Sequence, residues 1–137
     1  MASIRKDIPI AAPAAKLWDA VRDFGALHTR LVPGFVVDTK LDGEARIVTF
    51  ASGAMARELL VDCDDARQRL VYAILANERI KHYNAAVEIV GDGEARCRLV
   101  WTIDVLPHEI APYISSQMDL GASAMQKAFA KARAASA

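Results

Sequence analysis

The feature that most constrains this sequence is a long stretch, residues 35–106, in which apolar and polar side chains alternate with the two-residue period of a β-strand. Short runs rich in Gly and Asp interrupt the alternation, and such runs suit the tight turns of hairpins. Hairpin turns join neighbouring strands in antiparallel pairs. The pattern therefore predicts an antiparallel meander of six strands, over residues 35–41, 45–50, 55–62, 68–75, 82–90 and 95–106.

The N-terminal part of the chain adds a strand and two short helices. Residues 3–10 alternate loosely and predict an earlier strand, which Pro9 restricts to a sheet edge or a strand end. Pro13 can open a short helix, which Asp23-Phe24-Gly25 stops. A second short helix is predicted over residues 26–31. The element order is thus one strand, two short helices and six further strands.

One long helix is predicted to follow the meander. Pro107 ends the last strand, and residues 108–131 place their apolar side chains on one stripe of a helix. A seven-stranded antiparallel sheet curls, and covering its inner face with a single helix usually leaves a hollow. The stripe contains Met118, Gly121 and Met125, which favour a void or an adaptable pocket, because a filled core more often uses Leu and Phe. The two methionines could equally fill irregular gaps in the core.

Composition and charge narrow the class of protein. With 53% hydrophobic and 25% charged residues among 137, the chain is expected to fold as one α+β domain over residues 1–137. Seventeen Lys and Arg balance seventeen Asp and Glu, so no global field attracts polyanions, and we expect no nucleic-acid partner. No apolar run approaches the ~20 residues of a membrane span, and no signal-peptide core follows the N-terminus. We therefore expect a cytoplasmic protein without a membrane span.

Motifs for metal, nucleotide or nucleophilic chemistry do not emerge from the sequence. Cys63 and Cys97 form no CxxC pair, and three scattered histidines, His28, His82 and His108, make no ligand set. No GxSxG motif occurs, and the Gly-rich turn near residue 92 lacks the helix that a phosphate cradle needs. We expect no metal and no cofactor, and no residue is assigned as catalytic.

Four segments, together with this element order, resemble the polyketide cyclase/dehydrase branch of the START-like (SRPBCC) superfamily. They are LWDAVRDFG (17–25), RELLVD (57–62), YNA (83–85) and WTID (101–104). The resemblance implies a helix-grip fold, in which a seven-stranded antiparallel sheet wraps a long C-terminal helix around a deep apolar cavity. Plant abscisic-acid receptors and the birch-pollen allergen share that plan. Because the superfamily includes aromatase/cyclases, lipid carriers and hormone receptors, the resemblance implies a fold rather than one activity.

Glu58 is the acidic residue of greatest interest, because it lies in the middle of a predicted strand beside an apolar run. Strand parity leaves its direction open, since Glu58 shares a face with Leu60 while Leu59 and Val61 occupy the other. By similarity to the receptor branch it points into the cavity, where an unpaired carboxylate would favour its protonated form and serve as a general acid or base. Its removal by Glu58→Gln would then keep or raise the melting temperature. The alternative is a solvent-facing Glu58 paired with an Arg of a neighbouring strand.

Aromatic residues complete the predicted cavity wall. Tyr72 and Tyr83 lie on adjacent predicted strands, and each combines an apolar ring with a hydroxyl that can bind or polarise a ligand carbonyl. Trp101 shares parity with Cys97, Leu99 and Ile103, so it is expected on the apolar face of the last strand. The predicted ligand-binding residues are Glu58, Tyr72, Tyr83, Trp101, Met118, Gly121 and Met125.

Three functional hypotheses follow from the sequence. The first is a protein that binds a small hydrophobic or amphipathic molecule (a lipid, a polyketide or an aromatic metabolite) in an internal cavity. The second is a polyketide cyclase, aromatase or dehydratase that moves protons with acid and base groups of the same cavity. The third is an accessory protein that acts through its surface and keeps a vestigial cavity. Convergence of two or more ionisable groups inside the cavity would separate the second hypothesis from the first. The sequence leaves a homodimer open.

Overall fold

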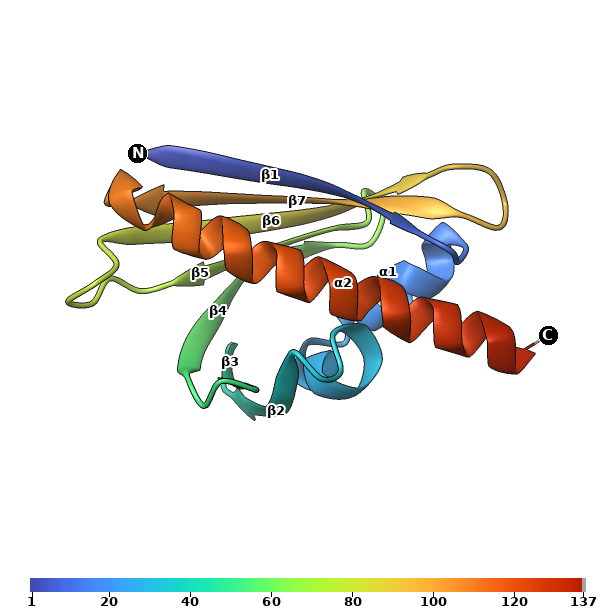
Figure 1. The fold of residues 1–137 in the computed structure, drawn as a ribbon, viewed down its shortest axis with the longest axis horizontal. Helices are drawn as coiled ribbons and strands as arrows, with labels where there is room; N and C mark the ends of the chain where they lie inside the picture. Colours follow the sequence, from blue (N-terminus) through green and yellow to red (C-terminus); the bar gives the residue numbers. More distant parts are fainter. Residues whose placement is uncertain (137) are drawn as a thin grey trace.

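A single antiparallel sheet of seven strands organises the computed structural model, which describes residues 1–136 (Figure 1). Its strand order is β1-β7-β6-β5-β4-β3-β2, so the predicted six-strand meander is confirmed. The first strand pairs with the last, which makes it an edge strand, as Pro9 predicted. The strands are β1 (Ala2–Ile10), β2 (Val36–Asp42), β3 (Ala45–Phe50), β4 (Met55–Asp64), β5 (Arg69–Ile74), β6 (His82–Gly91) and β7 (Cys97–Leu106).

The helices follow the predicted order with one change. The first is α1 (Ala14–Arg22), which Pro13 precedes. In place of a regular helix over 26–31, the chain forms a 3-10 turn, η1 (Phe24–Ala26), and a π-helical turn, η2 (Leu27–Leu31). The long C-terminal helix begins as a 3-10 turn, η3 (His108–Ile110), and continues as α2 (Ala111–Ser136). Among the described residues, no helix combines the length and apolarity needed to cross a membrane.

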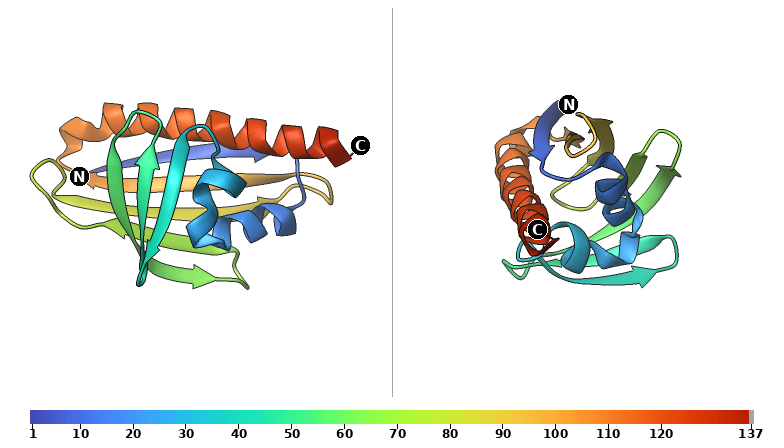
Figure 2. Two further views of the ribbon diagram at one scale, coloured as in Figure 1. Left: turned by 90° about the horizontal axis from the view of Figure 1, so that it is seen from below. Right: turned by 90° about the vertical axis from the view of Figure 1, so that its right-hand side faces the viewer.

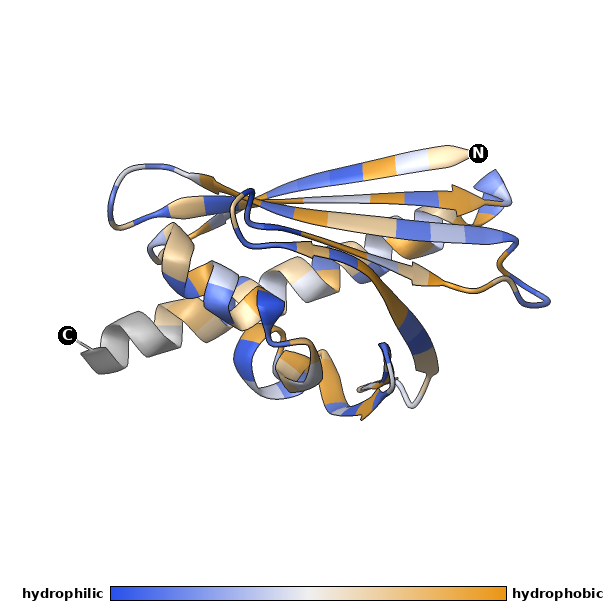
Figure 3. Ribbon diagram, turned by 180° about the vertical axis from the view of Figure 1, so that it is seen from behind, coloured by the Kyte–Doolittle hydropathy of each residue, from blue (hydrophilic) through white to orange (hydrophobic). Residues whose placement is uncertain are grey.

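The sheet is strongly curled, and two irregularities in strand pairing contribute to the curl. The register shifts between Val36 and Asp38 in β2 and between Leu60 and Asp62 in β4, as expected for β-bulges. A bulge adds an unpaired residue to one strand and increases its local twist and bend. Figure 2 shows the result, a sheet that wraps around a space bordered by α2 and by the short helices. Hydrophilic and hydrophobic residues alternate along the strands (Figure 3), and such alternation gathers apolar side chains on one face of a sheet.

The long helix α2 is fastened to the β1 edge of the sheet. The Lys6 ammonium donates a hydrogen bond to Ser115 Oγ at 2.8 Å and lies 3.0 Å from an Asp119 carboxylate oxygen. About two turns beyond Asp119, the Gln126 side-chain amide donates to the Pro9 carbonyl at 3.1 Å. The apolar stripe of α2 faces inward as predicted, and its buried members are Ile114, Met118, Gly121, Met125 and Phe129.

Gly121 brings α2 into close contact with the aromatic wall of the interior. A Cβ atom at this position would lie 3.2 Å from the Trp101 ring and 3.4 Å from the Phe35 ring. The first of these distances is shorter than an ordinary van der Waals contact, so any side chain larger than hydrogen requires the rings to move. The absence of a side chain at Gly121 therefore sets how closely α2 approaches Trp101 and Phe35.

A leucine at Gly121 is expected to overpack this contact. Gly121→Leu should lower the free energy of unfolding by about 1–3 kcal/mol, because the added atoms displace the Trp101 and Phe35 rings. Chemical denaturation followed by circular dichroism measures the change. Ser123→Leu, at an exposed position of the same helix, is the matched control and should stay within about 0.5 kcal/mol of the wild type. Equal stabilities for the two variants would contradict the close contact.

Candidate functional site

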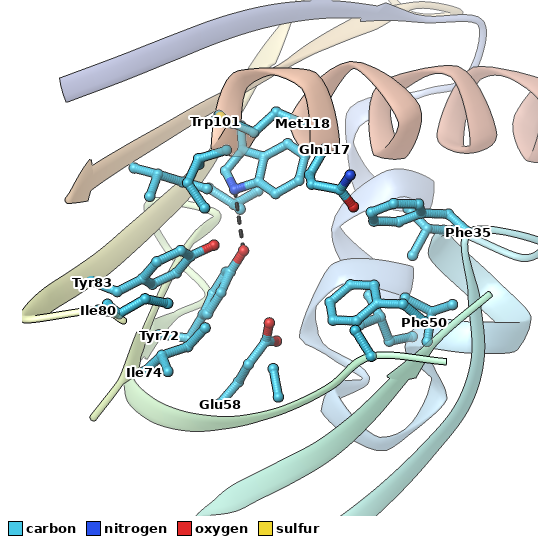
Figure 4. Close-up of a pocket in the computed structure, with 18 of the residues that line it drawn as sticks. Phe35, Phe50, Glu58, Tyr72, Ile74, Ile80, Tyr83, Trp101, Gln117 and Met118 are labelled. Atoms are coloured by element: carbon cyan, nitrogen blue, oxygen red, sulfur yellow. Dashed lines mark hydrogen bonds between the residues drawn. The ribbon is translucent and has the colours of Figure 1, made fainter. Parts of the chain in front are cut away.

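A cavity of about 590 Å³ lies between the inner face of the sheet, η2 and α2 (Figure 4). Its volume is typical of pockets that hold small molecules, roughly 300–1,000 Å³, and the prediction of an internal cavity is confirmed. Most of its wall is apolar. The apolar lining includes Leu27, Leu31, Val32, Phe35, Phe50, Leu70, Ile74, Ile80, Val87, Leu99, Ile103, Ile114, Met118 and Met125.

A buried ion pair interrupts this apolar wall. Arg46 on β3 and Glu58 on β4 face each other directly across the two strands. The Arg46 Nε–H group donates to Glu58 Oε1 at 2.8 Å, and the two side chains are only 6% and 7% exposed. The inward direction predicted for Glu58 from the resemblance is therefore confirmed. Its carboxylate is not unpaired, because the neighbouring-strand Arg of the alternative prediction lies inside the cavity with it.

Aromatic rings enclose the Arg46 guanidinium. Its Cζ atom lies 4.0 Å from the centre of the Phe24 ring and 5.3 Å from the centre of the Tyr72 ring. Its Nη1–H group also donates to the Phe24 carbonyl at 3.3 Å. Cation–π attraction is stronger where water is excluded, and a buried guanidinium needs partners for its N–H groups. Glu58 and the Phe24 carbonyl accept two of these N–H groups, and the Phe24 and Tyr72 rings add the cation–π contacts, so the arginine is partnered in an apolar interior.

Two tyrosines and a tryptophan form the polar surface beside the ion pair. The Trp101 Nε1–H group donates to the Tyr72 hydroxyl at 3.2 Å, and the centres of the Tyr72 and Tyr83 rings are 6.4 Å apart. Burial raises the pKa of the Tyr72 phenol well above its ordinary value, and the Glu58 charge raises it further. Burial also raises the pKa of Tyr83, with additional contributions from Tyr72 and Glu58. Both phenols therefore stay protonated at neutral pH and keep their O–H donors.

The entrance to the cavity is built from three segments that are distant in the sequence. They are the β3–β4 hairpin, the β5–β6 loop and the start of α2 with the preceding η3 turn. Gly53, at φ +92° in the hairpin, adopts a left-handed backbone conformation that a turn this tight requires. The exposed residues among the lining mark the opening, and they are Ser52, Ala54, Met55, Asn77, Arg79, Glu109 and Tyr113.

The structure brings together six of the seven residues predicted as cavity wall. They line the cavity from four strands and the long helix, and they are Glu58, Tyr72, Tyr83, Trp101, Met118 and Met125. Gly121 is not among the described lining residues, because the Trp101 and Phe35 rings cover it. The three histidines of the sequence are also absent from the described lining.

Arg46 is the functional residue that sequence reasoning missed. The signal was present in the hairpin that joins residues 45–50 to residues 55–62. A turn centred on Ser52 sets Arg46 opposite Glu58, and the Arg46, Val48 and Phe50 side chains then share the inner face. Counting back from the turn would have supplied the partner of Glu58. This pairing depends on the register of the hairpin. If the register shifted by one residue, Ile47 or Ala45 would lie opposite Glu58 in place of Arg46.

Comparison with protein families gives a match over nearly the whole chain. Residues 1–136 match the model of the family described as polyketide cyclase/dehydrase and lipid transport. The comparison with curated proteins gave no match.

Solved structures with this fold include proteins of different activities. A START superfamily protein from Mycobacterium smegmatis is 13% identical, with a TM-score of 0.79, and the match covers 94% of this chain and 97% of that one. Norcoclaurine synthase from Thalictrum flavum, solved with dopamine and hydroxybenzaldehyde, is 18% identical, with a TM-score of 0.68 and coverages of 92% and 84%. The di-domain ARO/CYC protein BexL of the BE-7585A biosynthetic pathway is 12% identical, with a TM-score of 0.79 and coverages of 93% and 46%. These likenesses show a START-type helix-grip fold, as the sequence predicted.

Because Glu58 is paired with Arg46, its replacement is expected to destabilise the protein, whereas an unpaired Glu58 predicted a melting temperature that is kept or raised. Glu58→Gln should lower the free energy of unfolding by roughly 3–5 kcal/mol, because it leaves the buried Arg46 charge uncompensated. Chemical denaturation checks the change, with Glu44→Gln at an exposed position of the β2–β3 turn as the control. A melting temperature kept or raised in Glu58→Gln, as expected for an unpaired carboxylate, would contradict the role of Arg46.

The buried phenols predict a loss of stability at alkaline pH. Because the pKa values of Tyr72 and Tyr83 are raised in the folded state, the unfolded chain releases their protons first. Their contribution to stability is therefore present below about pH 10 and declines as the pH rises above that value. Urea denaturation at increasing pH measures the decline, which should be smaller in a Tyr72→Phe/Tyr83→Phe variant. An equal decline in that variant would contradict the assignment.

Proposed function

This chain belongs to the polyketide cyclase/dehydrase and lipid transport family, and we propose that it binds a small hydrophobic or amphipathic molecule in the cavity between its sheet and α2. The observation that carries the proposal is the cavity itself, with a volume of about 590 Å³, an apolar wall and an opening to solvent. A cavity this large removes packing contacts from the interior and lowers stability. Occupation by an apolar ligand would restore those contacts.

The position of the polar groups supports an amphipathic ligand. The Arg46–Glu58 pair and the hydroxyls of Tyr72 and Tyr83 gather on one part of the wall, while most of the remaining lining is apolar. Pockets of this kind orient a ligand with a few polar contacts and hold its body by burial. The ligand class is therefore a lipid, a polyketide or an aromatic metabolite with a polar group at one end.

An enzyme of the cyclase, aromatase or dehydratase type is the second candidate. It is favoured by four ionisable side chains that converge on the cavity, namely Arg46, Glu58, Tyr72 and Tyr83. A protonated phenol can donate a hydrogen bond to a ketone oxygen, and a carboxylate can remove a proton from the adjacent carbon. We place this candidate second because the Glu58 carboxylate already accepts a hydrogen bond from Arg46 Nε–H at 2.8 Å, so its Oε1 atom is occupied. An accessory role with a vestigial cavity would be favoured by a filled interior, which this protein does not have.

Filling the cavity provides the test of the first candidate. Ala56 lines the cavity from β4, so Ala56→Phe should occupy part of its volume and weaken uptake of the neutral fluorescent dye N-phenylnaphthylamine by about tenfold. Val61→Phe adds the same side chain to the exposed outer surface of that strand and should bind the dye like the wild type. Uptake that is equal in both variants would contradict an internal binding site.

Turnover separates the two candidates. A linear polyketone offered to the wild type should be bound without conversion if the protein is a carrier or sensor. Mass spectrometry and absorbance would detect a cyclised or dehydrated product. A product whose rate of formation falls in Tyr72→Phe would instead support the enzyme, since the phenol then acts on the reacting carbonyl.

A further inference from the structure

The charged residues that line the cavity balance each other, both in its interior and at its entrance. Among the described residues that line it, Arg46 and Glu58 are the charged side chains of the interior. Arg79 and Glu109 are the charged side chains of the exposed entrance. Each level therefore carries one positive and one negative group. A ligand that enters meets no net charge at the opening and none at the polar end of the cavity.

From this balance we infer that the cavity selects ligands whose buried polar group is uncharged, and that it discriminates against free carboxylates such as fatty acids. The inference rests on the proposed function and adds the chemical class of the polar end. It derives from the 2.8 Å contact between Arg46 and Glu58, because Glu58 neutralises the charge of Arg46, the interior cation among the lining residues that the structure describes.

A charged ligand would gain no net attraction from this pair. A carboxylate next to Arg46 would also lie near the Glu58 carboxylate, and two like charges in a water-excluded site repel each other strongly. An ammonium group would meet the same difficulty with Arg46. Either ion would also give up its hydration on entering an apolar wall. The pair therefore disfavours both signs of charge.

A neutral hydrogen-bond acceptor is suited to the groups that remain. The Tyr72 hydroxyl oxygen accepts a hydrogen bond from Trp101 Nε1 at 3.2 Å, and its own O–H group is still a donor. The raised pKa values of Tyr72 and Tyr83 keep both phenols protonated as donors. A ketone, ester or quinone oxygen accepts such hydrogen bonds without bringing a charge. Figure 4 shows the Tyr72, Tyr83 and Glu58 side chains directed toward the same space.

Matched ligands test the inference on the wild-type protein. Acetylnaphthalene and naphthoate share one ring system and differ in carrying a ketone or an ionised carboxylate at neutral pH. Calorimetry or dye displacement should give a dissociation constant at least about tenfold lower for the ketone. Equal affinities, or tighter binding of naphthoate, would overturn the inference and leave the proposed function standing. If neither these compounds nor N-phenylnaphthylamine bound, the proposed function itself would fail.

A cationic ligand provides a second measurement that needs no variant. Naphthylmethylamine carries an ammonium group on the same rings, and it should also bind at least about tenfold more weakly than acetylnaphthalene. Equal affinity for the amine and the ketone would show that the interior accepts positive charge, and this result would overturn the inference.

Removing the negative partner should weaken the preference for the neutral ligand. In Glu58→Gln the Arg46 charge is left uncompensated, so naphthoate should gain at least about tenfold in affinity relative to acetylnaphthalene. Circular dichroism verifies that the variant is folded, and Glu44→Gln at the exposed turn serves as the charge-matched control. An unchanged ratio in folded Glu58→Gln would overturn the assignment of selectivity to the ion pair.

Discussion

A curled seven-stranded sheet has more concave surface than one helix can cover, and the attachment of α2 decides which part stays open. The Lys6 side chain binds both Ser115 and Asp119 of the helix and so holds it beside β1, at the edge of the sheet. The inner faces of β3, β4 and β5 lie on the far side of the resulting space and carry much of the cavity wall. Gly121 fixes the approach of the helix to Trp101. The cavity is thus a consequence of where one helix is fastened.

The Arg46–Glu58 pair connects this architecture to binding. Isolated charges are costly in an apolar interior, and a buried pair often contributes little net stability compared with apolar residues of similar size. Here the two strands that carry the pair are adjacent, so hairpin register sets the partners opposite each other. The stacking of Arg46 on Phe24 and Tyr72 offsets part of the desolvation cost. With this pair, the polar end of the cavity can form hydrogen bonds and yet carries no net charge. This neutrality is the basis of the proposed selectivity.

The sequence predicted the parts of the structure that depend on local pattern. Alternation placed Trp101 on the inner face, and helical spacing placed Met118 and Met125 there. Glu58 could not be oriented in this way, because both faces of its strand carry apolar residues and only the family resemblance indicated the inward direction. The partner of Glu58 depends on hairpin register, which one residue of turn length changes. The π-helical form of Leu27–Leu31 likewise has no signature in the spacing of its residues.

The central claim is that a small molecule occupies the interior, and the two tryptophans of the chain provide a direct measurement. The indole N–H of Trp101 lies in the cavity wall and donates to Tyr72, whereas that of Trp18 donates to Asp65 and is not among the described lining residues. Two-dimensional NMR of the labelled protein resolves the two indole signals during titration with acetylnaphthalene. The account predicts a saturable shift of the Trp101 signal with the Trp18 signal unchanged. A Trp101 signal that stays in place while the ligand binds would contradict an internal site.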